Sequence, residues 1–281
     1  MIDSAAIEII RVLQQAGHQA LIVGGAARDM MMGIPPHDYD IATSARPEEV
    51  QKLFQQTYAV GAQFGVIIVV MDNRHFEVAT FRSDGAYEDG RRPADVQYCG
   101  AREDAQRRDF TINALMYDPI ADEWYDYVNG QQDLQDKRIR AIGNPIMRFE
   151  EDHLRILRAF RFCFRFGFKI EKETLAAIQR LAPLTAAVSS ERTSEELTRI
   201  FTGPRPGEAL WALKKFGVLE HVLPEVAAMH GVPQPKEFHP EGDVLRHTCL
   251  TLDATLQLPA GRRTPELAWS ALLHDIGKPP T

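Results

Sequence analysis

Cysteine is scarce in this sequence, and long apolar runs are absent. The 281 residues hold three scattered cysteines, Cys99, Cys163 and Cys249, without metal-binding spacing. Such thiols are typical of a reducing compartment, so we expect no disulfide. No stretch approaches the roughly 18 apolar residues of a membrane span, and the first residues, MIDS, lack the basic and apolar regions of a secretory signal. We therefore expect a cytoplasmic protein with no membrane partner.

An excess of positive charge is also missing. The chain has 32 basic and 39 acidic residues, a net charge of −7, which argues weakly against a polyanionic partner. One segment differs, because nine basic residues from Lys137 to Lys169 stand against three acidic ones, so the local net charge is +6. A hydrophobic content of 44% is ordinary for a globular protein, and the length allows two or more domains.

The first informative motif is a double glycine. A buried-strand pattern over residues 20–23 meets Gly24 and Gly25, which precede a helix-compatible segment over residues 26–32. A helix N-terminus has unpaired N–H groups and a favourable dipole for anions. The turn therefore predicts a triphosphate site, with Arg28 close by.

Two aspartates separated by one residue follow this turn. The strand pattern over residues 38–43 has a period of two, which places Asp38 and Asp40 on one face. Such carboxylates can share Mg²⁺, and two metal ions about 3.5 to 4 Å apart can activate a hydroxyl and neutralise leaving pyrophosphate. The alternative is a solvated Asp-X-Asp pair without a function. Glu77 is a candidate third ligand, and its alternative is an exposed residue on an edge strand.

Periodicity in the first half predicts a mixture of helices and strands. The predicted elements are helices over residues 5–15 and 47–54 and a hairpin of strands over 64–71 and 75–81. Residues 82–106 are rich in Gly, Asp, Arg and Pro without a sustained period, and we interpret them as a mobile loop.

The next block, residues 107–114, reads RRDFTINA. Asp109 is predicted to begin or cap a helix, with Asn113 pointing inward. Paired arginines beside a carboxylate suit phosphates and a ribose hydroxyl, which makes Arg108, Asp109 and Asn113 candidates for nucleotide binding. The alternative is a surface ion pair.

Residues 148–158 carry Asp152 and Arg155, which share a face if the segment is one helix. The pair offers an acceptor next to rigid donors. Cytosine and adenine present an amino donor beside a ring-nitrogen acceptor, whereas uracil and guanine present the reverse, so the pair would select C and A. The alternative is an i,i+3 salt bridge. The helix continues in a basic stripe with candidate nucleotide and RNA contacts at Arg158, Arg161 and Arg165.

Three blocks together resemble one family. GGxxRD with DxD, then RRDFTINA, then EDxxR within RILRAxRF lie in this order between residues 18 and 225. They resemble the bacterial-type (class II) tRNA nucleotidyltransferase and poly(A) polymerase family. The resemblance implies an α+β fold, in which a polymerase-β-like nucleotidyltransferase head with a mixed sheet precedes an all-helical neck and body. The implied domains are a head at 1–140, a template and RNA-binding region at 141–225 and an incomplete HD-like segment at 226–281.

The resemblance also implies a function, the template-independent addition of CCA to tRNA 3′ ends from CTP and ATP with Mg²⁺. It implies metal binding by Asp38 and Asp40, triphosphate binding by Gly24, Gly25 and Arg28, ribose binding by Asp109, and base reading by Asp152 and Arg155. Residues 190–197 resemble the helix that supports the template. Residues 82–106 resemble the loop that helps the pocket switch from C to A.

A second resemblance begins near His239. His247, followed by His274 and Asp275 in the sequence LLHDIGKP, resembles the start of an HD domain, whose phosphohydrolase members bind metal through these positions and a later Asp. The sequence has no room for that Asp, so we expect no phosphohydrolase activity and no HD metal. His247 and His274 are then helix residues packed at a domain end.

Three alternatives remain open at this point. Relatives that add only A, only CC or a poly(A) tail share the same motifs, although the acidic net charge argues mildly against poly(A) synthesis. The second alternative is an HD phosphohydrolase with a degenerate head, and the third is a non-catalytic RNA-binding protein. Metal-dependent turnover separates the last from the others.

Overall fold

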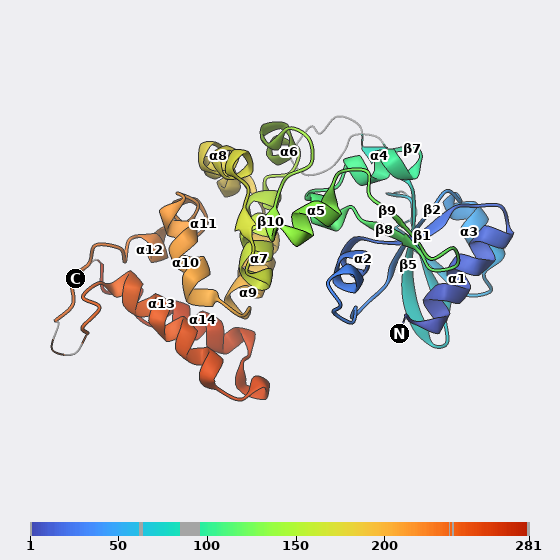
Figure 1. Cartoon of the computed structure of the whole chain (residues 1–281). Helices are drawn as coiled ribbons and strands as arrows, with labels where there is room; N and C mark the ends of the chain where they lie inside the picture. The colour runs from blue at the N-terminus through green and yellow to red at the C-terminus, as the bar shows by residue number, and fades with distance from the viewer. Residues whose placement is uncertain (1, 62–63, 85–95, 236, 238, 280–281) are drawn as a thin grey trace. The chain divides into compact units, whose positions relative to one another are not determined.

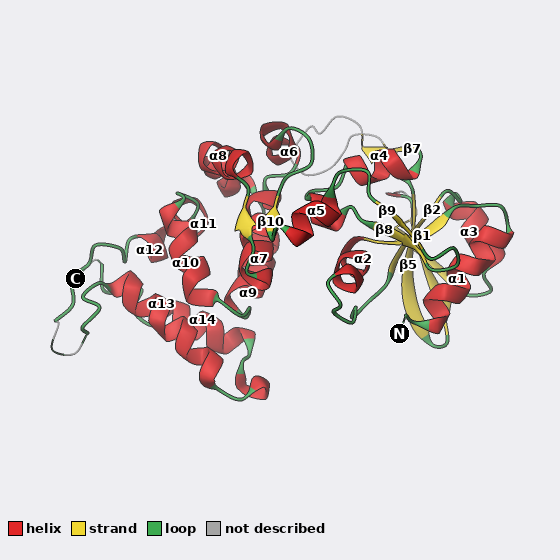
Figure 2. Ribbon diagram, viewed as in Figure 1, coloured by secondary structure: helices red, strands yellow, loops and turns green. Residues whose placement is uncertain are grey.

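The chain divides into two compact units. The computed structural model describes residues 2–61, 64–84, 96–235, 237 and 239–279 (Figure 1). Unit 1 comprises Met1–Asp136 and Arg140–Gly143, and unit 2 comprises Lys137–Ile139 and Asn144–Thr281. Strands dominate the interior of unit 1, whereas unit 2 is almost entirely helical (Figure 2). This confirms the predicted α+β class.

A seven-stranded mixed sheet forms the centre of unit 1, in the order β3-β4-β5-β2-β1-β8-β9. Its strands are β1 (Ala20–Val23), β2 (Asp40–Thr43), β3 (Thr57–Gly61), β4 (Val66–Met71), β5 (Arg74–Thr80), β8 (Met116–Asp118) and β9 (Glu123–Tyr125). Only β2 and β5 are parallel neighbours. Every residue of β1 is buried, as its unbroken apolar run predicts.

Short helices surround this sheet. They are α1 (Ser4–Gln15), α2 (Gly24–Met31), α3 (Pro47–Leu53), α4 (Ala101–Gln106), a 3₁₀ turn (Thr111–Asn113) and α5 (Gly130–Gln135). Asp3 caps α1 by accepting hydrogen bonds from the N–H groups of Ala5 and Ala6. The apolar face of α1 buries Ile9, Ile10 and Leu13, which explains why its 3.6-residue pattern was readable from the sequence.

The predicted hairpin is confirmed as β4 and β5. Asp72 and Asn73 connect the strands with φ of 51° and 57°. Asp and Asn tolerate this left-handed conformation, which two-residue hairpin turns require.

The predicted loop over residues 82–106 is wrong in the part that the structure describes. β6 (Arg82–Asp84) pairs antiparallel with β7 (Val96–Tyr98), and α4 follows. Residues 85–95 lie outside the described part of the chain. Because α4 has only six residues, its buried side chains Ala101 and Ala105 produce no visible period, although they pack with Phe81 in the core.

Unit 2 is built from helices and one short parallel ladder. The helices are α6 (Pro145–Glu151), α7 (Leu154–Phe166), α8 (Lys172–Leu181), α9 (Ser190–Phe201), α10 (Pro206–Lys215), α11 (Leu219–Val222), α12 (Pro224–Ala227), α13 (Val244–Ala254) and α14 (Pro265–Leu273), with 3₁₀ turns at Ala182–Ala187, Thr255–Gln257 and Ala260–Arg262. β10 (Arg138–Ile139) pairs with β11 (Lys169–Ile170). Among the described residues, no helix is long and apolar enough to span a membrane.

The passage between the units lies near the predicted boundary at residue 140. The chain enters unit 2 for Lys137–Ile139, returns to unit 1 for Arg140–Gly143, and then remains in unit 2. Within unit 2, α13 packs on α10 and α14 packs on α9. The division at residue 225 stays a prediction.

Candidate active site

Three carboxylates gather where the parallel strands β2 and β5 begin to pair. The pairing begins one residue after Asp40, the first residue of β2, and one residue after Glu77, which lies in the middle of β5. Partial burial raises the pKa of Asp40 to about 6, helped by the negative charges of Glu77 and Asp38, while Arg108 acts in the opposite direction. The site therefore concentrates negative charge around Asp40, a residue that remains accessible to solvent.

The strand predicted over residues 38–43 begins only at Asp40. Asp38 lies in the bend before β2, because the chain is still turning out of the Pro35–Pro36 segment. The period of two therefore does not explain the position of Asp38. Its negative charge is nevertheless close enough to raise the pKa of Asp40. β5 is an interior strand, so the edge-strand alternative for Glu77 is wrong, although the side chain itself is exposed.

The double glycine brings the backbone close to this cluster. Gly24 begins α2 and has a φ of +66°, a conformation that glycine adopts without strain. A Cβ at this position would lie 3.3 Å from Nη1 of Arg108 and 3.4 Å from Oδ2 of Asp40. The absence of a side chain therefore lets the N-terminus of α2 meet a carboxylate and a guanidinium together.

A buried chain of polar side chains ties α2 to the RRDFTINA block. The Arg28 side chain is almost fully buried, and its guanidinium donates to Oδ1 of Asn113 at 2.6 Å and to Oδ1 of Asp29 at 2.7 and 2.8 Å. Nδ2 of Asn113 donates to Oδ1 of Asp109 at 3.0 Å. Arg28 thus connects the glycine turn to Asp109 from inside the protein. Its predicted triphosphate contact stays a prediction.

The helix predicted at Asp109 is only the 3₁₀ turn Thr111–Asn113. The N–H of Phe110 donates to the Asp109 carboxylate at 2.8 Å, and Phe110 bridges to Ala141. Because β8 begins at Met116, the chain has no room for a longer helix. Asn113 points inward, as predicted.

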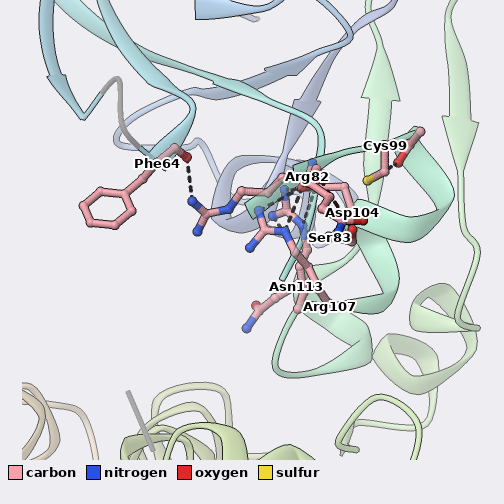
Figure 3. Close-up of polar contacts among 10 residues, drawn as sticks. Phe64, Arg82, Ser83, Cys99, Asp104, Arg107 and Asn113 are labelled. Atoms are coloured by element: carbon pink, nitrogen blue, oxygen red, sulfur yellow. Dashed lines mark hydrogen bonds and ion pairs between the residues drawn. The ribbon is translucent and has the colours of Figure 1, made fainter. Parts of the chain in front are cut away.

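Asp104 of α4 accepts hydrogen bonds from both arginines of the RRD motif, and Figure 3 shows it beside Arg107. Its Oδ1 accepts from Nε and Nη2 of Arg107 at 3.0 and 2.8 Å, and its Oδ2 accepts from Nε and Nη2 of Arg108 at 3.2 and 2.9 Å. The backbone N–H of Arg82 also donates to Oδ1, at 3.3 Å. Burial opposes ionisation of Asp104, but the charges of Arg108 and Arg107 and their hydrogen bonds lower its pKa overall. The motif is therefore no loose surface ion pair.

In unit 2, the side chains of Asp152 and Arg155 contact different residues, although the N–H of Arg155 donates to the carbonyl of Asp152 at 3.0 Å. The helix predicted over residues 148–158 breaks at Asp152, whose φ of −149° is extended. Arg192 of α9 donates to Oδ1 and Oδ2 of Asp152 at 3.2 and 2.8 Å. Nη1 of Arg155 donates to Glu151 and to the carbonyl of Arg148. Each predicted base-reading side chain therefore has its own anchor.

The basic stripe continues along α7. Arg158 and Arg161 lie near the buried Glu196, and their guanidinium carbons lie 5.5 and 4.3 Å from the ring centre of Phe162. Arg165 is exposed, with its guanidinium carbon 5.1 Å from the ring centre of Phe166. The stripe is thus a surface of arginines stacked on phenylalanines.

The histidines of the HD-like segment lie together. His239, Glu241 and His247 form one group whose potential ligand atoms lie within 4.8 Å of one another, and His247, His274 and Asp275 form a second. Nε2 of His274 lies 3.2 Å from the Asp275 carboxylate. The expectation that this segment holds no metal stays a prediction.

Two family models match the sequence. The "Poly A polymerase head domain" matches residues 20–140, and the "Probable RNA and SrmB-binding site of polymerase A" matches residues 167–229. The CCA-adding enzyme of Bacillus subtilis is 44% identical over 275 residues, which are 97% of this chain and 64% of that protein. The crystal structure of the Bacillus stearothermophilus CCA-adding enzyme in complex with CTP has a TM-score of 0.72 at 30% identity and covers 98% of this chain and 75% of that chain.

The chain belongs to the tRNA nucleotidyltransferase and poly(A) polymerase family. It spans about half the length of several curated relatives that it matches. For example, the CCA-adding enzyme of Enterococcus faecalis is 44% identical over 199 residues, which are 70% of this chain and 49% of that protein. The predicted membership in this family is confirmed.

Unit 1 holds both predicted catalytic residues, Asp38 and Asp40, and several of the predicted nucleotide-binding residues. The structure brings together the residues of the glycine turn, the carboxylates and the arginine motif, namely Gly24, Asp38, Asp40, Glu77 and Arg108. Sequence reasoning did not identify the residues that hold predicted site residues in place, namely Asp104 in unit 1 and Arg192 in unit 2. Asp104 had a visible signal, because it lies three and four positions before Arg107 and Arg108. No local pattern indicated the contact of Arg192 with Asp152, which lies forty positions away. The only pointer was that residues 190–197 resemble the family helix that supports the template.

Proposed function

We propose that the protein adds CCA to tRNA 3′ ends, using CTP and ATP and releasing pyrophosphate. The carboxylate cluster of Asp38, Asp40 and Glu77 beside the Gly24 turn carries this proposal. The names of the relatives, CCA-adding enzymes at 44% identity, support the same reaction. The reaction is an in-line attack of the tRNA 3′-hydroxyl on the α-phosphate of the incoming nucleotide.

The carboxylates fit a Mg²⁺ site. Mg²⁺ prefers oxygen ligands and is commonly held by one or two carboxylates plus substrate phosphates. The raised pKa of Asp40 reflects, besides partial burial, repulsion from Glu77 and Asp38, which a bound cation would relieve. Asp38 and Asp40, with Glu77 as a third ligand, would hold the metal. When bound, Mg²⁺ would assist the attacking hydroxyl and neutralise charge on the leaving pyrophosphate.

The rest of unit 1 would position the triphosphate. The N-terminus of α2 presents backbone N–H groups at Gly24 and Gly25, where an anion is favoured. Arg108 adds a guanidinium whose direction Asp104 sets. Asp109 would accept a hydrogen bond from the ribose, in an orientation that Asn113 holds.

Base selection is assigned to unit 2. Asp152 would accept a hydrogen bond from the amino group of cytosine or adenine, and Arg155 would donate to the ring nitrogen. Arg192 donates two hydrogen bonds to the Asp152 carboxylate and so orients it, and Glu151 accepts a hydrogen bond from Arg155. Uracil and guanine would place a carbonyl oxygen against the Asp152 carboxylate and a ring N–H against the Arg155 guanidinium. Buried polar groups that lose their partners in this way reject a wrong substrate strongly.

The test uses tRNA transcripts that end before CCA, after C and after CC. Each is incubated with Mg²⁺ and CTP, ATP or both, and the products are sized to single nucleotides. Completion of all three transcripts to CCA, followed by arrest, is expected. A-only addition, CC-only addition or long A tails would each replace the proposal by a related activity. No incorporation with any nucleotide would contradict nucleotidyl transfer by this chain.

A further inference from the structure

The backbone around Asp109 is tied to the segment at residues 140–142. The N–H of Thr111 donates to the carbonyl of Arg140 at 3.0 Å, and the N–H of Ile142 donates to the carbonyl of Asp109 at 3.2 Å. The residues between them form an isolated antiparallel bridge. Asp109 therefore lies on one side of a short backbone ladder within unit 1.

A buried carboxylate of α5 contacts both sides of this ladder. Asp133 is only 2% exposed. Its Oδ2 accepts a hydrogen bond from the Thr111 hydroxyl at 2.8 Å and another from Nε of Arg140 at 3.0 Å, and its Oδ1 accepts from Nη2 of Arg140 at 3.2 Å. Hydrogen bonds to a charged group are stronger than those between neutral groups. Asp133 therefore fastens the segment of Thr111 to the segment of Arg140.

The helix that carries Asp133 lies close against the same turn. Because Gly130 has no side chain, the first residue of α5 can approach the backbone of Thr111, and a Cβ on Gly130 would lie 2.3 Å from that carbonyl oxygen. The Asp126 carboxylate accepts hydrogen bonds from the N–H groups of Gly130 and Gln131, each at 2.9 Å. These bonds satisfy N–H groups at the start of the helix, which have no partner within it. The position of Asp133 relative to Thr111 is therefore well fixed.

Thr111 lies midway between two residues that are assigned to the sugar. Asp109 precedes it by two positions and Asn113 follows it by two. Nδ2 of Asn113 donates to Oδ1 of Asp109 at 3.0 Å. A shift of Thr111 would therefore move both the acceptor and the amide that orients it. A misplacement of about 1 Å in an active site can cost about a hundredfold in rate.

We propose that Asp133 is a positioning residue for the sugar of the incoming nucleotide, acting on Asp109 through the Thr111 hydroxyl. The inference rests on the proposed function, which assigns Asp109 to the ribose. Because Asp133 is buried, it acts through Thr111 and not by contact with the nucleotide. A site built to hydrogen-bond a hydroxyl strongly rejects an analogue that lacks it. Loss of Asp133 should therefore reduce selectivity for the sugar.

The first experiment compares CTP with 2′-deoxy-CTP and 3′-deoxy-CTP as substrates for one addition to a tRNA that lacks CCA. The wild type should use at least one of the two analogues much less efficiently than CTP. In Asp133→Asn this preference, measured as a ratio of kcat/KM values, should fall by roughly tenfold or more. Asp136→Asn removes an exposed carboxylate at the end of the same helix and is the matched control, which should keep the preference. An unchanged ratio in Asp133→Asn, or an equal fall in Asp136→Asn, would overturn the proposal.

A second pair of variants keeps the test valid if Asp133→Asn does not fold. Thr111→Val removes the hydroxyl that donates to Asp133 at nearly constant volume, whereas Thr111→Ser retains it. The sugar preference should fall in Thr111→Val and persist in Thr111→Ser. A merely structural role of the hydroxyl would lower activity with all three nucleotides equally and leave the ratio unchanged. That result, or an equal fall of the ratio in both variants, would contradict positioning through the hydroxyl.

Equilibrium binding separates this inference from the proposed function. The Kd values of CTP and the two analogues are measured with Mg²⁺ and without tRNA. Weaker discrimination by Asp133→Asn and Thr111→Val than by the wild type supports the positioning role. This result would stand even if the wild type transferred no nucleotide, which would overturn the proposed function alone. A wild type that binds and uses all three nucleotides equally would overturn the inference and leave CCA addition standing.

Discussion

Asp40 in unit 1 and Glu196 in unit 2 are acidic residues in opposite surroundings. Glu77 and Asp38 surround Asp40 with further negative charge, and its pKa rises to about 6. Glu196 is instead surrounded by Arg158, Arg161 and Arg199. The first arrangement favours a cation, whereas in the second the acidic side chain is paired with guanidinium groups. The neighbours therefore suit two acidic side chains to different tasks: Asp40 to the proposed metal site, and Glu196 to ion pairs with arginines of unit 2.

The largest expected effect comes from removing the centre of the unit 1 cluster. Asp40→Ala should reduce incorporation of every nucleotide by at least about a hundred- to a thousandfold, because the charge that would hold the metal is lost. The circular dichroism spectrum should not change, since the side chain is exposed. Glu48→Ala, an exposed acidic change on α3, is the control. Substantial remaining activity of Asp40→Ala would remove Asp40 from the metal site.

A change at Asp104 would test whether this buried carboxylate orients Arg107 and Arg108 for nucleotide binding. Asp104→Asn removes the charge that holds Arg107 and Arg108, and it should destabilise the protein by about 3 kcal/mol. The KM for CTP should rise about tenfold, because Arg108 loses its direction beside Gly24. Thermal unfolding and steady-state kinetics measure these effects. Glu103→Gln, on the exposed face of the same helix, should change neither the stability nor the KM for CTP. If both variants had the same stability and the same KM, the positioning role of Asp104 would be contradicted.

The proposed base selection by unit 2 can be tested separately from the proposed catalysis by unit 1. Arg155→Ala should relax the choice between CTP and UTP by roughly ten- to a hundredfold, because the donors to the ring nitrogen are lost. Arg192→Ala should act in the same direction, since Asp152 loses its anchor. The measurement is the ratio of kcat/KM for each nucleotide. Unchanged selectivity against UTP and GTP would rule out the side-chain template.

The smallest effect concerns pH and the repulsion at Asp40. A carboxyl group with a raised pKa costs folding stability as the pH rises from about 4 to about 6, and the full cost persists above that range. Glu77→Gln removes one cause, so in EDTA at pH 7 the melting temperature should rise by roughly 1 to 2 °C. Metal affinity should fall at the same time, and for wild type it should decline as the pH drops through about 6. A lower melting temperature for Glu77→Gln would contradict repulsion at this site.

Particular residues show where prediction from the sequence worked. β1 and the β4-β5 hairpin were predicted because an apolar run and an Asp-Asn turn are local signals. The motif residues Gly24 and Asp40 were also found, and they lie close together. Two errors have different causes. α4 is too short to show a period. At the helix break, the Asp152 carboxylate accepts both the nearby N–H of Leu154 and the distant guanidinium of Arg192.

The sequence alone determined β1, the β4-β5 hairpin, the family and the residue types that can carry out the chemistry, because these depend on local patterns. Only the tertiary structure decided which side chains meet. Arg28 reaches Asn113 across 85 positions, and Arg192 reaches Asp152 across 40. Such pairs leave no periodic signal, since they form only when packing of the apolar core brings distant segments together.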